Sequence, residues 1–328
     1  MKSEVKIVVI GGGTGLSVLL RGLKKVTNNI TAVVAVSDDG GGSGVLREDL
    51  GMLPPGDIRS CILALSNKEP ILQELFQYRF NEGRLKNQNF GNLMIAAMTG
   101  ISENFEEAVK KISDIFAITG KVLPVTTDDI ELIATLEDGT RVVGESNIPY
   151  SAVKKKSKIK SLSLTPPDAK VLPEVIEEIK EADVVVIGPG SLYTSIISNL
   201  LLEELREAIR LASGRVVYIG NVMTQLGETD GFGLREHIQV VETYLGSNVI
   251  DTVYANNGAV ASETLTKYAI EEAKPVVVTP EDEAYCLEKA IELIQDDFVE
   301  IKKGYLRHDA EKLAKRIVQD VDIRLYIH

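Results

Sequence analysis

Short runs of β-branched and aliphatic residues alternate along the chain with segments whose apolar residues recur every three or four positions. This alternation is typical of repeated βα units and a parallel sheet. The helical segments include 16–25, 103–116, 171–182 and 309–321, together with a long helical stretch between about 57 and 117. The predicted strands of the main sheet are 6–10, 30–36, 183–187, 216–219, 252–255 and 276–279. We therefore predict an α/β fold with a Rossmann-like, doubly wound, mostly parallel sheet.

The middle of the chain has a different pattern. Residues 122–126, 130–136, 141–145 and 159–164 have the alternation of strands, and 137–140 is a hairpin turn. We expect a small, mostly antiparallel β insertion at about 121–165, lying over one end of the main sheet. The rest of 1–328 shows no convincing linker, which favours a single α/β domain that binds a nucleotide ligand. The basic run 154–158 is either a solvated face or a docking patch for an acidic partner.

The amino-acid composition excludes several classes of function. Of the 328 residues 5% are aromatic and none is Trp, so a core of Ile, Leu, Val and Ala is expected. The formal charge is 36 − 48 = −12, which repels nucleic-acid phosphates and anionic membranes and predicts neither as a partner. The two cysteines form no disulfide framework, and no apolar run approaches the ~20 residues of a membrane span. We expect a cytoplasmic protein.

A glycine-rich loop follows the first predicted strand. Glycine at 11–13 and 15 lets the backbone approach an anion, and the helix that follows adds N–H donors and a positive dipole end. The candidate ligand contacts are Gly12, Gly13, Thr14 and Gly15. The loop is not a dinucleotide fingerprint, because the third glycine of that motif would fall at Leu16, and no Walker sequence is present. A tight turn without a ligand is the alternative.

The loop after the second strand, Ser37–Gly44, is acidic as well as glycine-rich. Ser37, Asp38 and Asp39 are candidate ligand contacts, and the two carboxylates are the candidate ligands of a divalent cation such as Mg²⁺. A cation bound to a phosphate would explain this loop and the first one together. The alternative is a flexible, solvated loop.

Two further polar segments precede helices. Asp57 and Arg59 would act as orienting carboxylate and anion clamp, or as a helix cap with a surface ion pair. Asn89 and Asn92 are either helix caps or polar contacts to a ligand.

The later strands end in similar loops. Gly188, Gly190 and Ser191 lie in a second glycine-rich loop that follows a strand, and they are candidate ligand contacts for the same reason as the first loop. Two phosphate-binding loops fit a diphosphate better than a single phosphate. Ligands of open α/β sheets bind outside the carboxyl ends of the strands, so the loops are expected to converge on one face. The chain has only three histidines and no G-x-S-x-G elbow, so binding is favoured over catalysis. The candidates after the next two strands are Asn221, Thr224, Gln225, Asn256 and Asn257.

These loops together carry a family resemblance. The run 11–23 resembles the start of the bacterial gluconeogenesis factor family, and so do the acidic loop, 54–59, 90–93, 188–195, 221–225 and 256–257. That family is similar to the phospholactate transferases of deazaflavin coenzyme synthesis. The resemblance implies a cytoplasmic protein that is needed for cell shape and wall synthesis on gluconeogenic carbon sources. It also implies a UDP-sugar ligand, UDP-N-acetylglucosamine or UDP-glucose, with no established reaction and no established cofactor.

The same resemblance adds two site residues and two partners. Tyr268 and Arg307 match positions associated with the sugar-nucleotide pocket; otherwise they would be a helix surface residue and a cap or ion-pair partner. A cell-wall-control protein and a second copy of the chain are the expected protein partners. The family often carries Ser where this acidic loop has Gly42, which removes one hydroxyl.

These observations support three hypotheses for the function. The leading hypothesis is a UDP-sugar sensor without catalysis. The rival is a Mg²⁺-dependent transferase that moves a phospho-group from a nucleotide-activated donor, with Asp38 and Asp39 holding the metal. The third, an NAD-dependent oxidoreductase, is disfavoured by Leu16.

Overall fold

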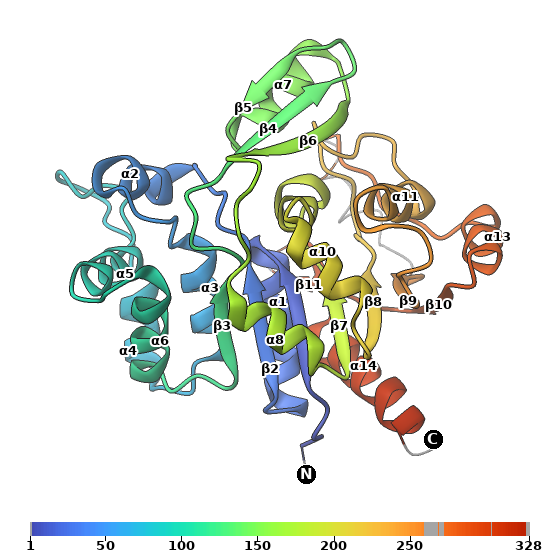
Figure 1. Ribbon diagram of the computed structural model, residues 1–328, viewed down its shortest axis with the longest axis horizontal. Helices are drawn as coiled ribbons and strands as arrows, with labels where there is room; N and C mark the ends of the chain where they lie inside the picture. The colour runs from blue at the N-terminus through green and yellow to red at the C-terminus, as the bar shows by residue number, and fades with distance from the viewer. Residues whose placement is uncertain (1, 259–267, 269–271, 303, 326–328) are drawn as a thin grey trace.

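The structure is a computed structural model that describes residues 2–258, 268, 272–302 and 304–325. Figure 1 shows a sheet covered by helices, with a small insertion of strands and one helix projecting from one end. The elements, in chain order, are β1 (Ile7–Gly11), α1 (Gly13–Val26), β2 (Ile30–Val34), α2 (Gly41–Leu50), α3 (Gly56–Leu65), α4 (Pro70–Gln77), α5 (Phe90–Gly100), α6 (Phe105–Ile115), β3 (Lys121–Pro124), β4 (Glu131–Leu136), β5 (Arg141–Val143), α7 (Asn147–Lys155), β6 (Ile159–Thr165), α8 (Pro173–Lys180), β7 (Val184–Ile187), the π-helix η1 (Leu192–Ile197), α9 (Ser198–Leu200), α10 (Glu203–Arg210), β8 (Arg215–Ile219), α11 (Leu234–Leu245), β9 (Thr252–Asn256), α13 (Pro280–Glu288), β10 (Glu292–Asp296), β11 (Val299–Lys302), β12 (Tyr305–His308) and α14 (Ala310–Leu325).

The central sheet confirms the predicted fold class. Its seven strands run in the order β10-β9-β8-β7-β1-β2-β3, and every neighbouring pair is parallel. Chain order runs outward from β1 to β3 on one side and from β7 to β10 on the other. The direction of winding therefore reverses between the adjacent strands β1 and β7. The loops after these two strands meet at the carboxyl edge, which is where doubly wound sheets bind ligands.

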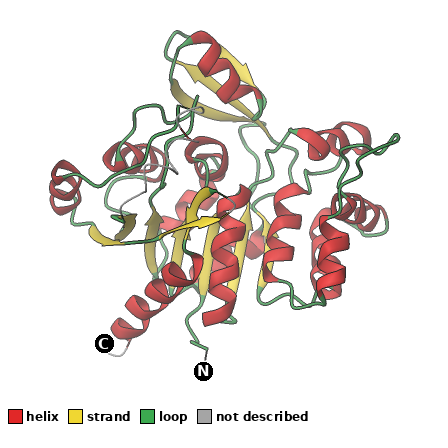
Figure 2. Cartoon of the chain, turned by 180° about the vertical axis from the view of Figure 1, so that it is seen from behind, coloured by secondary structure: helices red, strands yellow, loops and turns green. Residues whose placement is uncertain are grey.

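Helices cover both faces of the sheet. The residues of β1 and β7 are completely buried, as expected for unbroken apolar strands between two helical layers. Helix α1 packs against α3 and α14 on one face, and α8 packs against α10 on the other (Figures 1 and 2). Gly22 permits the close approach of α1 and α14, because a Cβ there would collide with the carbonyl group of Ala310. Among the described residues, no helix is long and apolar enough to cross a membrane.

The C-terminal part of the sheet differs from the prediction. Residues 276–279 are not a strand: Pro275 makes one isolated bridge to Met223, and Thr279 caps α13. Among the described residues, no strand forms a ladder with this β-branched run. The strand next to β9 is instead β10, which lies parallel to it, and β11 and β12 form an antiparallel pair. The sequence pattern did not predict these three strands.

The insertion is smaller than predicted and is not purely β. Residues 121–124 form β3, which pairs in parallel with β2 at the edge of the main sheet and so lies outside the insertion. The insertion itself is an antiparallel sheet in the order β5-β4-β6, with helix α7 packed on it. The basic run 154–158 lies at the end of α7, where Lys154, Lys155 and Lys156 are exposed.

Candidate ligand-binding site

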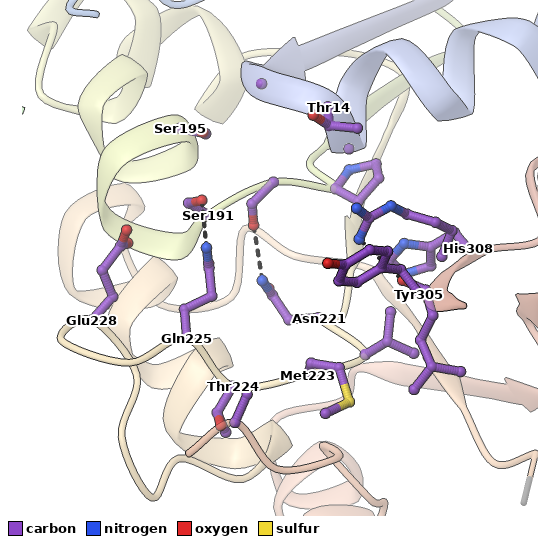
Figure 3. A pocket seen from close by; sticks show the side chains of 18 of the residues that line it. Thr14, Ser191, Ser195, Asn221, Met223, Thr224, Gln225, Glu228, Tyr305 and His308 are labelled. Atoms are coloured by element: carbon purple, nitrogen blue, oxygen red, sulfur yellow. Dashed lines mark hydrogen bonds between the residues drawn. The ribbon is translucent and has the colours of Figure 1, made fainter. Parts of the chain in front are cut away.

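A cavity of about 680 Å³ lies at the point where the winding of the sheet reverses (Figure 3). The loops after β1, β7 and β8 form most of its wall, and β12 closes one side. Its size and its mixture of apolar and polar groups are typical of small-molecule sites. The lining residues are Gly12, Gly13, Thr14, Gly15, Val18, Pro149, Pro189, Gly190, Ser191, Ser195, Asn221, Val222, Met223, Thr224, Gln225, Leu226, Glu228, Tyr268, Ala273, Tyr305, Leu306, Arg307 and His308.

The start of α1 gives the cavity a group of backbone donors. Gly12, the N-cap residue of α1, has no side chain to cap the helix, and of the N–H groups in the first turn that of Gly13 donates to Oδ2 of Asp57. A Cβ at Gly15 would lie 2.8 Å from the carbonyl oxygen of Pro189, so glycine lets the loops after β1 and β7 touch. The N–H groups of a first helical turn, with the positive end of the helix dipole, favour an anion.

The second glycine-rich loop is arranged differently, because a carboxylate of the chain lies against it. Glu228 accepts hydrogen bonds from the backbone N–H of Tyr193 at 3.1 Å and from Oγ1 of Thr194 at 3.0 Å. Burial raises the pKa of Glu228, and these hydrogen bonds act in the opposite direction. The first donors of η1 are therefore engaged by Glu228, as the first donor of α1, the backbone N–H of Gly13, is engaged by Asp57.

The side chains after β8 hold the second loop in place. Asn221 donates from Nδ2 to the carbonyl oxygen of Gly190 at 2.8 Å, and Gln225 donates from Nε2 to Oγ of Ser191 at 2.8 Å (Figure 3). Oε1 of Gln225 is buried and has no hydrogen-bond partner among the described residues. Thr224 uses its hydroxyl to accept from the backbone N–H of Lys274. The side chain of Gln225 thus holds Ser191 in place, while its Oε1 has almost no accessible surface.

The side formed by β12 is aromatic and cationic. Tyr268 is buried and accepts a hydrogen bond from the backbone N–H of Leu306 at 2.8 Å, so its interpretation as a helix surface residue is wrong. The rest of the predicted segment 265–269 lies outside the described residues. The guanidinium of Arg307 lies 5.5 Å from the ring centre of Tyr305. Burial lowers the pKa of His308 to about 4, so its imidazole is neutral near pH 7.

A group of acids lies behind the first loop. Oδ2 of Asp57 accepts from the backbone N–H of Gly13, so Asp57 caps α1 and not its own helix α3. Burial, together with the charge of Asp38, raises the pKa of Asp57 to about 6 against the opposing hydrogen bond from Gly13. Glu145, from the insertion, accepts from Oγ of Ser37 at 2.8 Å. Burial and the neighbouring Asp38 raise the pKa of Glu145 to about 8.

The candidate metal ligands bond to different segments. Oδ1 of Asp38 accepts from the backbone N–H of Gly40, and Oδ1 of Asp39 accepts from that of Ser146, each at 2.9 Å. The described part of the chain contains no group of three or more His, Cys, Asp or Glu side chains placed to hold a metal ion. Residues 41–44 form the first turn of α2 and not a flexible loop. The Mg²⁺ site stays a prediction.

Several other polar candidates bond to the protein itself. Arg59 donates from Nε to Oδ1 of Asn92 at 2.9 Å. Asn89 caps α5 by accepting from the backbone N–H of Asn92. Asn256 accepts from the backbone N–H of Phe298, which places its amide in the turn after β10. Structural roles therefore account for these side chains without a ligand.

The structure brings about half of the candidate residues together. The candidates at the cavity wall are Gly12, Gly13, Thr14, Gly15, Gly190, Ser191, Asn221, Thr224, Gln225, Tyr268 and Arg307. The candidates outside it are Ser37, Asp38, Asp39, Asp57, Arg59, Asn89, Asn92, Gly188, Asn256 and Asn257. The principal lining residues that were not predicted are Pro149, Glu228, Tyr305 and His308, of which Tyr305 and His308 lie close to the predicted Arg307 in the sequence.

Comparison with known proteins identifies the family. The family described as 2-phospho-L-lactate transferase CofD matches residues 7–299. The chain is 52% identical to a relative from Clostridium acetobutylicum over 317 residues, which cover 96% of this chain and 69% of the relative. It is 44% identical to the gluconeogenesis factor of Bacillus subtilis over 319 residues, which cover 97% and 98% of the two chains. The chain belongs to the gluconeogenesis factor family.

A solved structure supports this assignment. The crystal structure of a upf0052-family protein from Bacillus halodurans superposes with a TM-score of 0.91 at 45% sequence identity. The match covers 96% of this chain and 99% of that one. The predicted relationship to gluconeogenesis factors, and through the CofD family to phospholactate transferases, is confirmed.

Proposed function

We propose that this member of the gluconeogenesis factor family binds a UDP-sugar in the cavity beside α1. The observation that carries the proposal is the glycine-rich first turn of α1, where Thr14 and Gly15 line a cavity of about 680 Å³ at the reversal point of the sheet. A diphosphate suits this position because backbone N–H donors and the helix dipole attract it without any lysine. UDP-N-acetylglucosamine and UDP-glucose are the sugar nucleotides that the family resemblance favours.

The remaining walls suit the other parts of such a ligand. Arg307 supplies a positive charge near the phosphates, and the rings of Tyr268 and Tyr305 lie edge to face with centres 6.2 Å apart. Gln225 and Ser191 supply polar groups. Convergent polar groups on an otherwise apolar wall are what a small-molecule site needs for orientation and specificity.

We assign the protein a regulatory role in preference to a catalytic one. Two titratable groups at the cavity wall already have partners in the chain: His308 contacts the carbonyl oxygen of Gly220, and Glu228 contacts the start of η1. Neither is poised as a base. In this proposal the protein acts in the cytoplasm on cell shape and wall synthesis during gluconeogenic growth. Its signal passes to a cell-wall-control protein, and the regulator is a homo-oligomer.

A second candidate function rests on the acids behind the first loop. The pKa of Asp57, raised to about 6, is close to that of an effective general base at neutral pH. Mg²⁺ commonly uses one or two carboxylates together with substrate phosphates, so Asp38 and Asp39 could hold it only with help from a bound nucleotide. This arrangement would suit transfer of a phospho-group, the chemistry named by the CofD family.

Calorimetry followed by product analysis separates the two functions. The purified chain is titrated with UDP-N-acetylglucosamine, UDP-glucose and NAD⁺, with and without Mg²⁺. Micromolar binding corresponds to about −8 kcal/mol. The proposal predicts saturable binding of a UDP-sugar, none of NAD⁺, and intact ligand by mass spectrometry after incubation. Absence of UDP-sugar binding contradicts it.

Consumption of the ligand would instead support the transferase. In that case a variant with Asp38→Asn and Asp39→Asn must lose turnover, while the UDP-sugar regulator predicts normal binding by the same variant. Both substitutions preserve side-chain size, so loss of the fold is not expected to confuse the result.

A further inference from the structure

The insertion carries a basic segment on an otherwise acidic protein. Residues 146–167 contain five lysines and no Asp or Glu, although the whole chain has a formal charge of −12. The rest of the chain therefore carries −12 − 5 = −17. The basic segment, residues 154–160, covers the end of α7 and the start of β6. Its lysines are all exposed: Lys154, Lys155, Lys156, Lys158 and Lys160.

The charge of the basic segment is only partly balanced by neighbouring acids. In the part of the chain that the structure describes, none of the five lysines forms an ion pair. The hairpin turn brings two acids close: the backbone N–H of Glu137 donates to the carbonyl oxygen of Lys158 at 2.9 Å, and that of Asp138 donates to Oγ of Ser157 at 3.1 Å. Two acids beside five lysines leave an excess of positive charge.

Helix stability explains only part of this pattern. Lys154 and Lys155 lie in the last turn of α7, where a cation interacts favourably with the negative end of the helix dipole. Lys158 and Lys160 lie beyond the helix, and the effect of the dipole is confined to the last turn. The remaining lysines therefore have no such structural role.

Exposed apolar side chains lie among the lysines. Tyr150 is 66% exposed and Val153 is 43% exposed, and their spacing places them on the same side of α7. Nζ of Lys154 lies 5.8 Å from the ring centre of Tyr150, and Nζ of Lys158 lies 5.6 Å from the ring centre of Phe232. Phe232 precedes α11, so the basic segment borders both the insertion and the body of the protein. Such a surface suits a partner that carries carboxylates together with apolar groups.

We propose that the basic segment docks a flexible acidic segment of a partner protein. Residues 146–167 contain no arginine, whose planar fork is the preferred donor to phosphates, so a nucleic acid or a lipid headgroup is disfavoured. A stiff duplex or a flat membrane also could not follow a surface that passes from the projecting insertion onto a body of opposite charge (Figure 1). A flexible peptide can.

Helix α7 connects the basic segment to the ligand cavity. Pro149, in the first turn of α7, lines the cavity. Lys154 follows about 8 Å further along the helix axis, at roughly 1.5 Å per residue. A Cβ at Gly227 would collide with the carbonyl group of Pro149, so the helix packs tightly against the loop after β8. A protein docked on the basic segment is thus placed to receive a signal that depends on the ligand.

Binding of a model peptide tests the docking site. A fluorescein-labelled peptide of glutamates around a central phenylalanine is titrated with the full chain, and its anisotropy is measured at about 0.15 M salt, where the Debye length is roughly 8 Å. The comparison ligands are the same peptide with glutamine in place of glutamate, vesicles of phosphatidylcholine with phosphatidylglycerol, and duplex DNA. Because no UDP-sugar is added, failure of the proposed function leaves this test unaffected.

Two double variants separate the position of the charges from the net charge. Lys154→Gln with Lys155→Gln removes two charges from the basic segment, and Lys68→Gln with Lys110→Gln removes two charges elsewhere. All four lysines are exposed, so both variants are expected to fold, and their melting temperatures check this. The first variant should bind the acidic peptide about three- to tenfold more weakly, the effect of two lost exposed ion pairs, and the second should bind it as the wild type does. Tyr150→Ser should also weaken binding.

Four results would overturn the proposal. Absence of peptide binding at this salt concentration means that the basic segment is only a solvated surface. Equal binding of the glutamine peptide removes the role of charge. Equal weakening by the two double variants means that binding follows the net charge of the chain. Binding of vesicles or DNA in place of the peptide, lost in the Lys154→Gln, Lys155→Gln variant, assigns the segment to a different polyanion.

Discussion

Replacing Gly15 by alanine tests the contact between the two glycine-rich loops. The added Cβ would lie 2.8 Å from the carbonyl oxygen and 3.0 Å from the carbonyl carbon of Pro189, and 3.2 Å from the backbone nitrogen of Gly190. These are backbone atoms of the loop after β7, so the loop or α1 must move. Gly100 is the matched control. It lies in the last turn of α5, and a Cβ there meets no atom within 4 Å.

Both substitutions improve the helix propensity of the residue, but only Gly15→Ala also forces a carbon atom against packed backbone. Alanine is better than glycine in a helix by roughly 0.5–1 kcal/mol, less at a helix end. Forcing an extra carbon against a packed wall costs about 1–3 kcal/mol. We therefore expect Gly15→Ala to lower the free energy of unfolding by about 1–2 kcal/mol, and Gly100→Ala to leave it unchanged or raise it slightly. The moved loop should also weaken UDP-sugar binding about tenfold, or ~1.4 kcal/mol.

Urea unfolding monitored by circular dichroism gives the stability of both variants, and calorimetry gives their affinities. A Gly15→Ala protein as stable as the Gly100→Ala protein, with wild-type affinity, would refute the argument that these loops must touch to form the site.

Three further predictions concern buried polar groups. The pKa values of Asp57, about 6, and Glu145, about 8, lie above their unfolded values of 3.8 and 4.5. These two carboxyl groups therefore bind more protons in the folded chain than in the unfolded chain between roughly pH 4 and 8, and their contribution to the melting temperature should fall as pH rises through this window. Glu145→Gln should flatten the upper part of that decline, and an unchanged slope would contradict the assignment. Glu228→Leu leaves the backbone N–H groups of Tyr193 and Thr194 without their acceptor and should lower the free energy of unfolding by about 1–3 kcal/mol in urea, whereas wild-type stability would show that these hydrogen bonds contribute little. Tyr268→Phe leaves the backbone N–H of Leu306 without its acceptor and should lower the free energy of unfolding by about 1–3 kcal/mol in the same assay. An unchanged free energy of unfolding would show that this hydrogen bond is absent in solution.

The parts of the fold that sequence could predict are those with a local signal. The apolar runs 7–10 and 184–187 are buried on both sides and end in glycine-rich loops, so the two strands and the loops of the site could be recognised without their neighbours. The strand β10, Glu292–Asp296, has no such signal because three of its five residues are charged or amide-bearing. It is a strand because β9 offers it a free edge, and that pairing is not visible locally.

The residues of the candidate site also differ in whether the sequence alone could predict their roles. Glycines at strand ends were predictable, because close backbone approach needs them. The role of Glu228 was not, because its partners lie 34 and 35 residues earlier in the chain. Asp57 resembled the cap of its own helix but caps α1, 44 residues away. Asn256 ends a strand as a ligand contact would, yet the backbone of Phe298 occupies its oxygen. Such side chains take their roles from packing between distant segments.

A crystal structure of the chain grown with UDP-N-acetylglucosamine would test the central claim most directly. The account predicts phosphate oxygens within hydrogen-bonding distance of the backbone N–H groups of residues 14 and 15, with the rest of the nucleotide in the same cavity. Density for the nucleotide outside this cavity, or for its phosphates away from the start of α1, would contradict it.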